Sequence, residues 1–215
     1  MRLKTGKRHH YEFDARVPFL ICGPGIIPSS HPAWLTGNVD FAPTILELAG
    51  WRSAASPRVW EPPSQMDGTS FARKLMGSAA VVPPPAVPAR AERSEFILEF
   101  TGLTKWPKGE GPDGACPASG CHSLNDCPNN TYRALRIVTP SNESWSTGLG
   151  SNLLYTEFTT TSDWFYKDVF FRSLFDLNAD PYQLQNVLPS VPAAAATKLA
   201  QRMAQVWGCV GKACP

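Results

Sequence analysis

The densest cluster of cationic side chains in the sequence is Lys7-Arg8-His9-His10, here called the basic segment. Tyr11-Glu12-Phe13-Asp14-Ala15-Arg16 follows it and leads into the apolar run Val17–Ile21, which stops at a Gly-Pro-Gly turn. A basic loop that feeds a buried strand can hold an anion over the end of a sheet, because fixed positive charge stabilises an anion where water is excluded. Taken alone, the basic segment also fits a solvated surface loop.

Single residues near the basic segment allow a chemical or a structural interpretation. His9 and His10 are candidate general acids or substrate contacts, whereas the simpler interpretation leaves both rings exposed. Glu12 and Arg16 are expected to form an ion pair that orients the loop. Asp40 is expected to cap the N-terminus of the helix that follows it.

The composition excludes several partners. The 215 residues include 20 basic and 18 acidic side chains, which gives a formal net charge of +2. This balance gives no general case for binding nucleic acid or a membrane surface, so any preference for anions must be local. The sequence has no run of about 20 apolar residues that would span a membrane. Its 21 prolines and 16 glycines indicate many loops, and 43% hydrophobic residues suffice for a core.

The cysteines favour disulfides over a metal site, because no histidine stands at zinc-finger spacing from them. Cys209 and Cys214 are expected to pair with each other. One pair is expected among Cys116, Cys121 and Cys127, and the sequence does not decide which. Cys22 ends an apolar strand and is expected to be a buried thiol.

Two glycosylation sequons begin at Asn129 and Asn142 and, with the disulfides, indicate an oxidising compartment. A secreted or lysosomal protein should begin with a signal peptide, but no apolar stretch follows Met1–Lys7. An incomplete N-terminus would reconcile the two observations.

Local patterns predict two different halves. In the first half we expect a strand at Val17–Ile21 that is buried on both faces, a helix over 41–49 and a short helix at Phe71–Met76. A proline-rich linker at 77–92 separates this half from residues 93–215. The second half predicts a small α+β domain with an antiparallel sheet and a C-terminal helix over 193–206. Its strands are expected at Glu95–Phe100, Tyr132–Val138, Asn152–Phe158 and Ser173–Leu177.

The first half lacks the material for an α/β core. A strand buried on both faces needs neighbouring strands, and parallel neighbours need crossover helices. Residues 1–76 offer one such strand and one good helix. A partner chain must supply the missing layers, or the sequence is part of a longer polypeptide.

Several motifs occur in the order and spacing found in the formylglycine-dependent sulfatases. Gly6-Lys7-x-x-x-Tyr11-Glu12, the stretch from Asn38 to Gly50 and Met66-Asp67-Gly68-x-Ser70 resemble segments of that family. In the second half, Asn152-Leu153-x-Tyr155-x-Glu157-Phe158 and the segment from Asp176 to Asn186 are similar to its N-acetylglucosamine-6-sulfatase branch. The matches extend over nearly the whole chain.

The resemblance implies an alkaline-phosphatase-like α/β fold for residues 1–76, followed by the small α+β domain. It implies hydrolysis of a sulfate ester on a sulfated sugar, with calcium and a formylglycine made from the cysteine of a C-x-P-S-R motif. That motif and the family's acidic metal ligands do not occur here, so the nucleophile and the calcium site are expected outside this sequence. Of the family's catalytic residues only the sulfate-contacting lysine maps onto this chain, as Lys7.

We therefore expect the C-terminal part of a lysosomal or secreted sulfatase, inactive by itself. Two alternatives remain open: a non-catalytic carbohydrate-binding or accessory protein, and a truncated gene product without a function of its own. Trp106 and Trp145 are further candidates for stacking against sugar rings, although either could be a core or loop residue.

Overall fold

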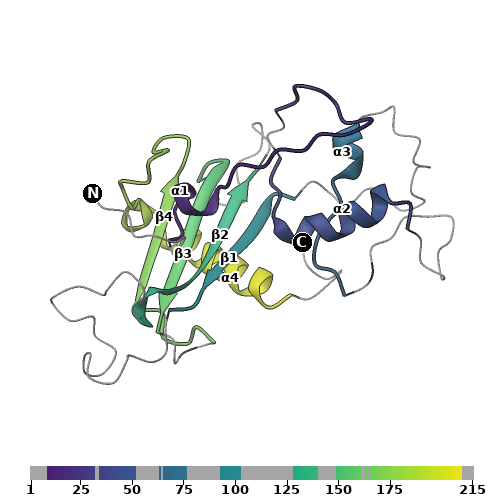
Figure 1. The fold of residues 1–215 in the computed structure, drawn as a ribbon. Coiled ribbons are helices and arrows are strands. Elements are labelled where there is room, and N and C mark those ends of the chain that lie inside the picture. The colour runs from purple at the N-terminus through teal and green to yellow at the C-terminus, as the bar shows by residue number, and fades with distance from the viewer. Residues whose placement is uncertain are drawn as a thin grey trace, which may run out of the picture. The chain divides into compact units, whose positions relative to one another are not determined.

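The computed structural model describes residues 9–31, 34–51, 63, 65–76, 93–102, 128–139, 149–160, 163 and 165–209. These residues belong to two compact units. The first unit comprises Met1–Val17 with Ile97–Met203, and the second comprises Pro18–Phe96 with Ala204–Pro215. The linker predicted at 77–92 lies outside the described residues. Figure 1 labels the helices and strands.

A four-stranded sheet with the strand order β1-β2-β3-β4 is the centre of the first unit. The strands are β1 (Glu95–Phe100), β2 (Thr131–Val138), β3 (Asn152–Thr159) and β4 (Phe171–Asp176). β3 runs antiparallel to both of its neighbours, and Tyr155 lies opposite Leu135 on one side and Leu174 on the other. The predicted antiparallel sheet is therefore confirmed, with strand ends within two residues of those expected.

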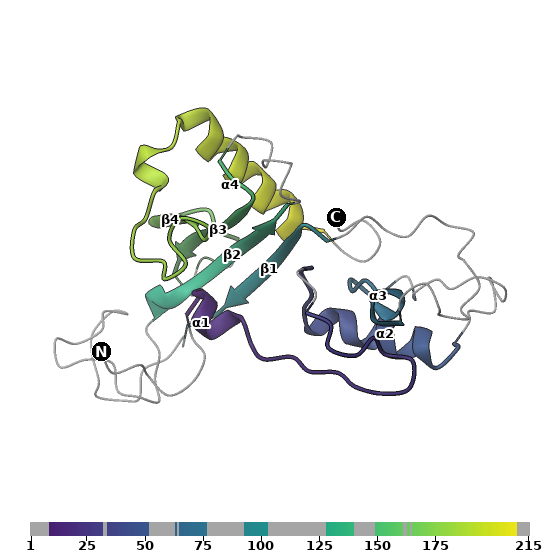
Figure 2. The same ribbon diagram turned by 90° about the horizontal axis from the view of Figure 1, so that it is seen from above.

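Helices cover both faces of this sheet, which explains why almost every residue of β2 and β3 is buried. α4 (Ala193–Trp207) lies over one face, and its buried residues Ala195, Leu199 and Met203 recur at helical spacing. The short helix α1 (Glu12–Ala15) lies over the opposite face, as the two views in Figures 1 and 2 agree. The predicted C-terminal helix is confirmed.

The core on the α1 side of the sheet is rich in aromatic rings. Successive strand residues point to opposite faces, so alternate positions of β2, β3 and β4 contribute to this core. Its buried members are Tyr132, Ala134, Leu154, Phe175 and Leu177, and Tyr11 and Phe158 pack against them. Tyr11 immediately precedes α1, so the apolar contacts that hold α1 come from the same stretch of chain.

The second unit contains α2 (Phe41–Leu48) and α3 (Ala72–Met76), with the 3-10 helix η1 (Asn38–Asp40) before α2. Both α-helices match the predicted ranges. Gly50 has a φ of 74°, a left-handed conformation that glycine adopts without strain and that ends α2. Two further 3-10 helices, η3 (Pro128–Asn130) and η4 (Leu188–Ser190), lie in the first unit.

Asp40 is the polar centre of the second unit and is only 2% exposed. Its side chain does not cap α2, contrary to expectation. Its carboxylate instead accepts hydrogen bonds from the amides of Gly37 (2.9 Å) and Thr69 (2.7 Å) and from Nη2 of Arg93 (2.9 Å). The helix itself is confirmed, and Asp40 ties it to the Met66–Ser70 segment through Thr69. A buried carboxylate needs such partners because its desolvation is costly.

Gly68 allows the Met66–Ser70 segment to approach η1 closely. A Cβ atom at Gly68 would clash with the carbonyl oxygen of Val39, which is main chain and has little freedom to move. Thr44 adds a second link, because its hydroxyl accepts a hydrogen bond from the amide of Phe71 at 3.1 Å. Two motifs that are separate in the sequence are therefore packed side by side.

The strand predicted at Val17–Ile21 is wrong in this structure. The described residues of this run form no strand, and Leu20 is 94% exposed. Phe19 packs on Phe41 with ring centroids 4.8 Å apart but remains 42% exposed. The prediction failed because a strand requires a hydrogen-bonding neighbour, and the described part of the chain provides none to this run.

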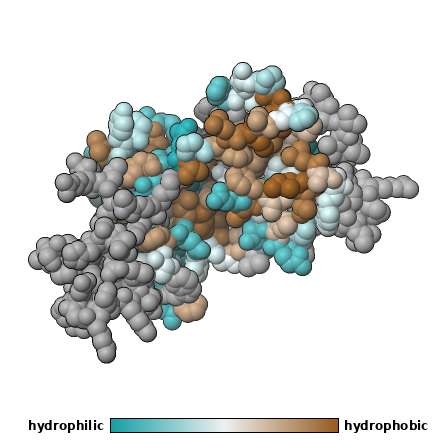
Figure 3. All heavy atoms as spheres, viewed as in Figure 1, coloured by the Kyte–Doolittle hydropathy of each residue, from teal (hydrophilic) through white to brown (hydrophobic). Residues whose placement is uncertain are grey.

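The environments expected for Cys22 and for the Glu12–Arg16 pair are also wrong. Cys22 is a free thiol but is exposed, because the segment that precedes it is not covered. Glu12 pairs with Arg136 and not with Arg16, which is exposed. Figure 3 shows apolar side chains at the surface around α2 and α3, where Ile45 and Leu48 are exposed in addition to Phe19 and Leu20. Within the described ranges, no helix has both the length and the apolar character needed to cross a membrane.

Candidate functional site

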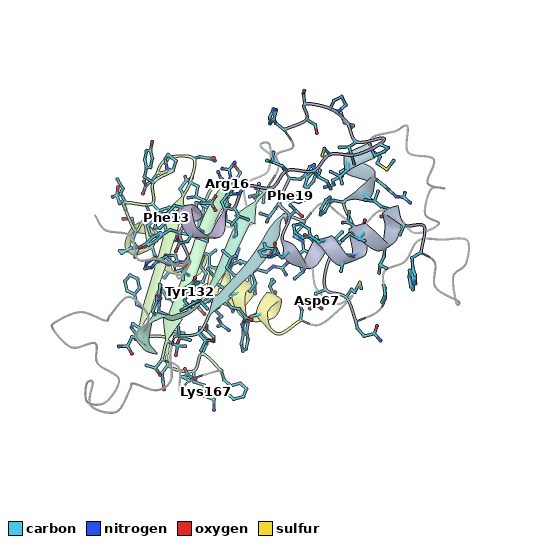
Figure 4. The ribbon with its side chains drawn as sticks, in the orientation of Figure 1. Phe13, Arg16, Phe19, Asp67, Tyr132 and Lys167 are labelled. Atoms are coloured by element: carbon cyan, nitrogen blue, oxygen red, sulfur yellow. The ribbon has the colours of Figure 1, made fainter. Side chains whose placement is uncertain are left out.

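The stretch from His9 to Arg16 continues the basic segment and lies on the sheet of the first unit. Figure 4 labels Phe13 and Arg16, which lie in and directly after α1, and Tyr132 in the sheet. Lys7 and Arg8 lie outside the described residues. The described part of the candidate site therefore begins at His9.

Glu12 makes the main polar contacts of this stretch. Its Oε1 accepts a hydrogen bond from Nε of Arg136 in β2 at 2.7 Å, which is also an ion pair. Its main-chain N–H donates to Oε1 of Gln183 at 2.7 Å. We call these three residues, Glu12, Arg136 and Gln183, the Glu12 latch. The latch joins one point of α1 to two positions that are 124 and 171 residues away in the sequence.

Gln183 is held in an unusual backbone conformation. Its φ is 57°, a left-handed backbone value that residues other than glycine rarely adopt, and its side chain is buried. The main-chain N–H of Gln183 donates to the carbonyl of Asp180 at 3.0 Å, which closes a turn after β4. The turn thereby directs the side-chain amide of Gln183 toward α1.

His10 is a core residue and does not occupy the exposed position expected for it. It is 5% exposed, and its ring lies 4.1 Å from that of Tyr11 and 5.2 Å from that of Phe158, centroid to centroid. Burial, with a smaller contribution from the neighbouring charge of His9, lowers the pKa of His10 from 6.5 to about 4. The ring is therefore neutral near pH 7. Because it faces the core, it is not available as a substrate contact in this structure.

His9 is half-buried at the edge of the same ring cluster. Its main-chain N–H donates to Oδ2 of Asp14 at 2.9 Å, and this bond closes a short loop around α1. Its ring centroid lies 6.2 Å from that of Tyr11 and 6.3 Å from that of Phe13. A role for His9 in binding substrate stays a prediction.

The remaining predicted site residues are only partly described. Asn129 is exposed in η3, and its glycosylation stays a prediction. Cys209 is disulfide-bonded, and the cysteine predicted as its partner lies outside the described residues. Also outside the described ranges are Cys116, Cys121, Cys127, Asn142, Cys214, Trp106 and Trp145.

A second polar cluster lies on the opposite face of the sheet and was not expected from the sequence. Glu157 is 1% exposed, and its Oε2 accepts hydrogen bonds from Nε and Nη2 of Arg133 at 2.9 and 2.7 Å. Its Oε1 accepts from the Tyr155 hydroxyl at 2.8 Å and from Nε of Arg172 at 3.3 Å. Burial and the adjacent Glu157 carboxylate raise the pKa of Tyr155. The ring of Tyr166 lies 4.3 Å from the Arg133 guanidinium.

The second cluster is best explained as a structural ion network, because the Glu157 carboxylate is fully occupied by donors. Only the strand register brings its members together, since Glu157 lies opposite Arg133 on one side and Arg172 on the other. In the sequence, the alternation of charged and apolar residues in β2 and β3 was the only indication of this cluster. That pattern does not indicate which charged residues form ion pairs across the strands.

Comparison with known proteins identifies the class to which the chain is related, the sulfatases. No family model matches the chain. The chain is 32% identical over 223 residues to N-acetylglucosamine-6-sulfatase from Bos taurus, an alignment that covers 99% of the chain and 33% of that protein. The identity to the human protein of the same name is 30% with the same coverage, and to an arylsulfatase from Volvox carteri it is 30% over 220 residues.

The predicted resemblance to sulfatases, including the N-acetylglucosamine-6-sulfatases, is thereby confirmed. The chain spans about a third of the length of the curated relatives it matches first. A solved structure of a protein bound to its substrate D-glucosamine-2-N,6-O-disulfate overlaps 78% of this chain and 22% of that one. Its TM-score is 0.39 at 20% sequence identity.

Proposed function

We propose that this chain is the C-terminal part of a sulfatase, and that the whole protein hydrolyses a sulfate ester on a sulfated sugar. The observation that carries the proposal is the sequence similarity to N-acetylglucosamine-6-sulfatases along 99% of the chain. The proposed substrate is a 6-sulfated N-acetylglucosamine unit of a glycosaminoglycan or a related polysaccharide. The proposed location is lysosomal or extracellular, which suits a chain with a disulfide-bonded cysteine.

In this proposal residues 1–76 complete an alkaline-phosphatase-like α/β domain, 77–92 are a linker and 93–215 form the C-terminal domain. The sequence alignment with the bovine relative supports the first assignment, because it covers 99% of this chain and so includes these residues. The four-stranded sheet with α4 is the described part of the C-terminal domain.

Lys7 is the proposed contact to the sulfate. Cleavage of a sulfate ester builds negative charge on the equatorial oxygens, and a fixed ammonium group stabilises that charge where water is excluded. The sequence motif supports this role, because Lys7 stands at the lysine position of Gly6-Lys7-x-x-x-Tyr11-Glu12.

The calcium and formylglycine of the family do not fit the residues that the structure describes. No group of three or more His, Cys, Asp or Glu side chains in the described ranges is arranged to hold a metal ion. We therefore derive no step through either group from this chain.

The test replaces the matching third of the bovine relative with this chain. The purified chimaera is assayed for sulfate release from a panel of 6-sulfated N-acetylglucosamine sugars. We expect turnover, and a loss of about 10²- to 10³-fold in kcat for Lys7→Ala, the size found for removing one group that stabilises an oxyanion. Lys167→Ala removes an exposed lysine of the sheet unit and is the matched control.

Two results would count against this function. A folded chimaera that releases no sulfate from any sugar of the panel would refute the assignment as a sulfatase. Equal activity of the Lys7→Ala and Lys167→Ala chimaeras would refute the role of Lys7. The 215-residue chain alone should release no sulfate from 4-methylumbelliferyl sulfate, because it has no C-x-P-S-R motif.

A further inference from the structure

We propose that the face of the sheet under α1 binds an internal water molecule, which bridges the hydroxyls of Thr156 and Ser173 and reaches the His10 ring. The inference does not depend on the proposed function, because it concerns only the described part of the sheet unit. Three features of this face support it: buried polar atoms without a partner, a row of short side chains, and the ring that covers this row.

Three buried polar atoms on this face have no hydrogen-bond partner among the described residues. They are Oγ1 of Thr156, Oγ of Ser173 and Nε2 of His10, in residues that are 0%, 2% and 5% exposed. A buried polar atom without a partner is costly, and about 90% or more of such atoms in folded proteins have one. Three exceptions on one face therefore indicate a shared partner.

The strand register places Thr156 of β3 and Ser173 of β4 directly opposite each other. The Cβ atoms of directly opposite residues lie about 4.5–5.5 Å apart, so these two hydroxyls face the same space above the sheet. They do not bond to each other. One water molecule between them can donate to one hydroxyl and accept from the other.

Room for a water molecule comes from the size of the side chains around this pair. Ala134, Thr156 and Ser173 lie opposite one another in β2, β3 and β4 and form a row of short side chains, here called the short row. The rows on either side carry long side chains: Tyr132, Phe158 and Phe171 in one, and Arg136, Leu154 and Phe175 in the other. A small molecule can therefore fit above the short row, between the long side chains.

The His10 ring covers the short row. Its centroid lies 5.2 Å from that of Phe158 and 6.1 Å from that of Phe175. These two rings stand two residues beyond Thr156 and two residues beyond Ser173, at diagonal positions around the pair. A ring that contacts both of them lies over the pair, so its unpartnered Nε2 is a third polar group beside the same space.

The polar groups beside this space favour a neutral ligand. Burial lowers the pKa of His10 to about 4, so the ring is uncharged near pH 7. Hydroxyls and a neutral imidazole can each donate or accept a hydrogen bond, as water can. An ion would lose its hydration and meet only uncharged groups at Thr156, Ser173 and His10. Buried water with two to four polar partners is a regular part of folded proteins.

The direct measurement detects water at Ala134, which lies opposite Thr156 in the short row and is 0% exposed. NOE and ROE spectra of the 215-residue chain with ¹³C-labelled methyl groups are recorded after selective excitation of water. We expect a cross-peak at the Ala134 methyl group with opposite signs in the two spectra, the signature of a long-lived water. Leu135 is the matched control, because it is also 0% exposed but points to the other face of the sheet. No cross-peak at Ala134 would overturn the proposal.

A stability measurement tests the same site by the sign of its effect. Thr156→Val keeps the shape of the side chain and removes the hydroxyl. It should raise the equilibrium constant for unfolding about fivefold, the factor that corresponds to one hydrogen bond. Ser173→Ala should act in the same direction, and the double variant should lose less than the product of the two changes, because both hydroxyls bind one water. Ser190→Ala removes an exposed hydroxyl and is the matched control.

Two outcomes of the unfolding measurements would overturn the proposal. An unchanged or lower unfolding constant in Thr156→Val would show that the hydroxyl binds nothing, because losing an unpartnered hydroxyl is neutral or stabilising. Fully multiplicative effects of Thr156→Val and Ser173→Ala would show that the two hydroxyls share no ligand. The NMR measurement needs only the natural chain and therefore decides the question if a variant does not fold.

Discussion

The buried His10 ring should make the sheet unit sensitive to acid. In the folded chain its pKa is about 4, against an ordinary value of 6.5, because burial disfavours the charged ring. The unfolded chain therefore binds the proton at a higher pH than the folded chain does. Between about pH 6.5 and pH 4 protonation favours the unfolded state, so stability is full above this window and falls as the pH falls through it.

The size of the effect follows from the difference between the two pKa values. The pKa values differ by about 2.5, and a difference of one pKa unit corresponds to about 1.4 kcal/mol. The full loss in the free energy of unfolding is therefore about 3 kcal/mol. The linkage relation gives a loss of about 2 kcal/mol between pH 7 and pH 5. A domain with a typical stability of 5–15 kcal/mol would lose a measurable part of it.

The assay is urea unfolding of the 215-residue chain, followed by circular dichroism at half-unit steps from pH 4 to pH 7.5. His10→Phe fills the same aromatic site without a titrating group. Its stability should depend less steeply on pH, by up to about 1.4 kcal/mol per pH unit between pH 4.5 and pH 6. His31→Gln removes an exposed histidine and should leave the slope unchanged. Parallel curves for His10→Phe and the natural chain over this window would refute the reasoning.

Three further substitutions test the packing. Arg133→Met leaves the buried Glu157 carboxylate short of its main partner and should lower the free energy of unfolding by about 3–5 kcal/mol in urea titrations; a loss below 1 kcal/mol would contradict the burial of this pair. Gly68→Ala places a Cβ against main chain and should cost more than about 2 kcal/mol, whereas Gly23→Ala, whose nearest contact is at 3.9 Å, should cost little by the same measurement. Leu20→Lys should reduce self-association of the chain, measured by light scattering at high concentration, because an exposed apolar run promotes association. Unchanged self-association would show that this run does not mediate it.

Local patterns predicted the elements of the sheet unit well, because each one is encoded within a few neighbouring residues. α4 shows the 3.6-residue spacing of Leu199 and Met203, and the strands are bounded by turn residues. The same reasoning failed for Val17–Ile21. Apolar composition can indicate that a segment suits a buried strand, but it cannot provide the neighbouring strand that hydrogen bonding requires.

The candidate site was less predictable, because its contacts are long-range. Glu12 was assigned to Arg16, four residues away, whereas its partners are Arg136 and Gln183. His10 belongs to a basic cluster in the sequence. Nothing in that cluster indicates that its ring packs among aromatic side chains from three strands. Such contacts depend on the register of the sheet and on which face α1 covers.

The Glu12 latch also has a consequence for the order of folding. Its two bonds close loops of 124 and 171 residues, and closing long loops costs entropy that short-range contacts do not have to overcome. The strands β2, β3 and β4 can pair before α1 docks, whereas α1 has no stable position until Gln183 has left the ribosome. α1, which precedes the strands in the sequence, is therefore expected to reach its final position only after they have paired.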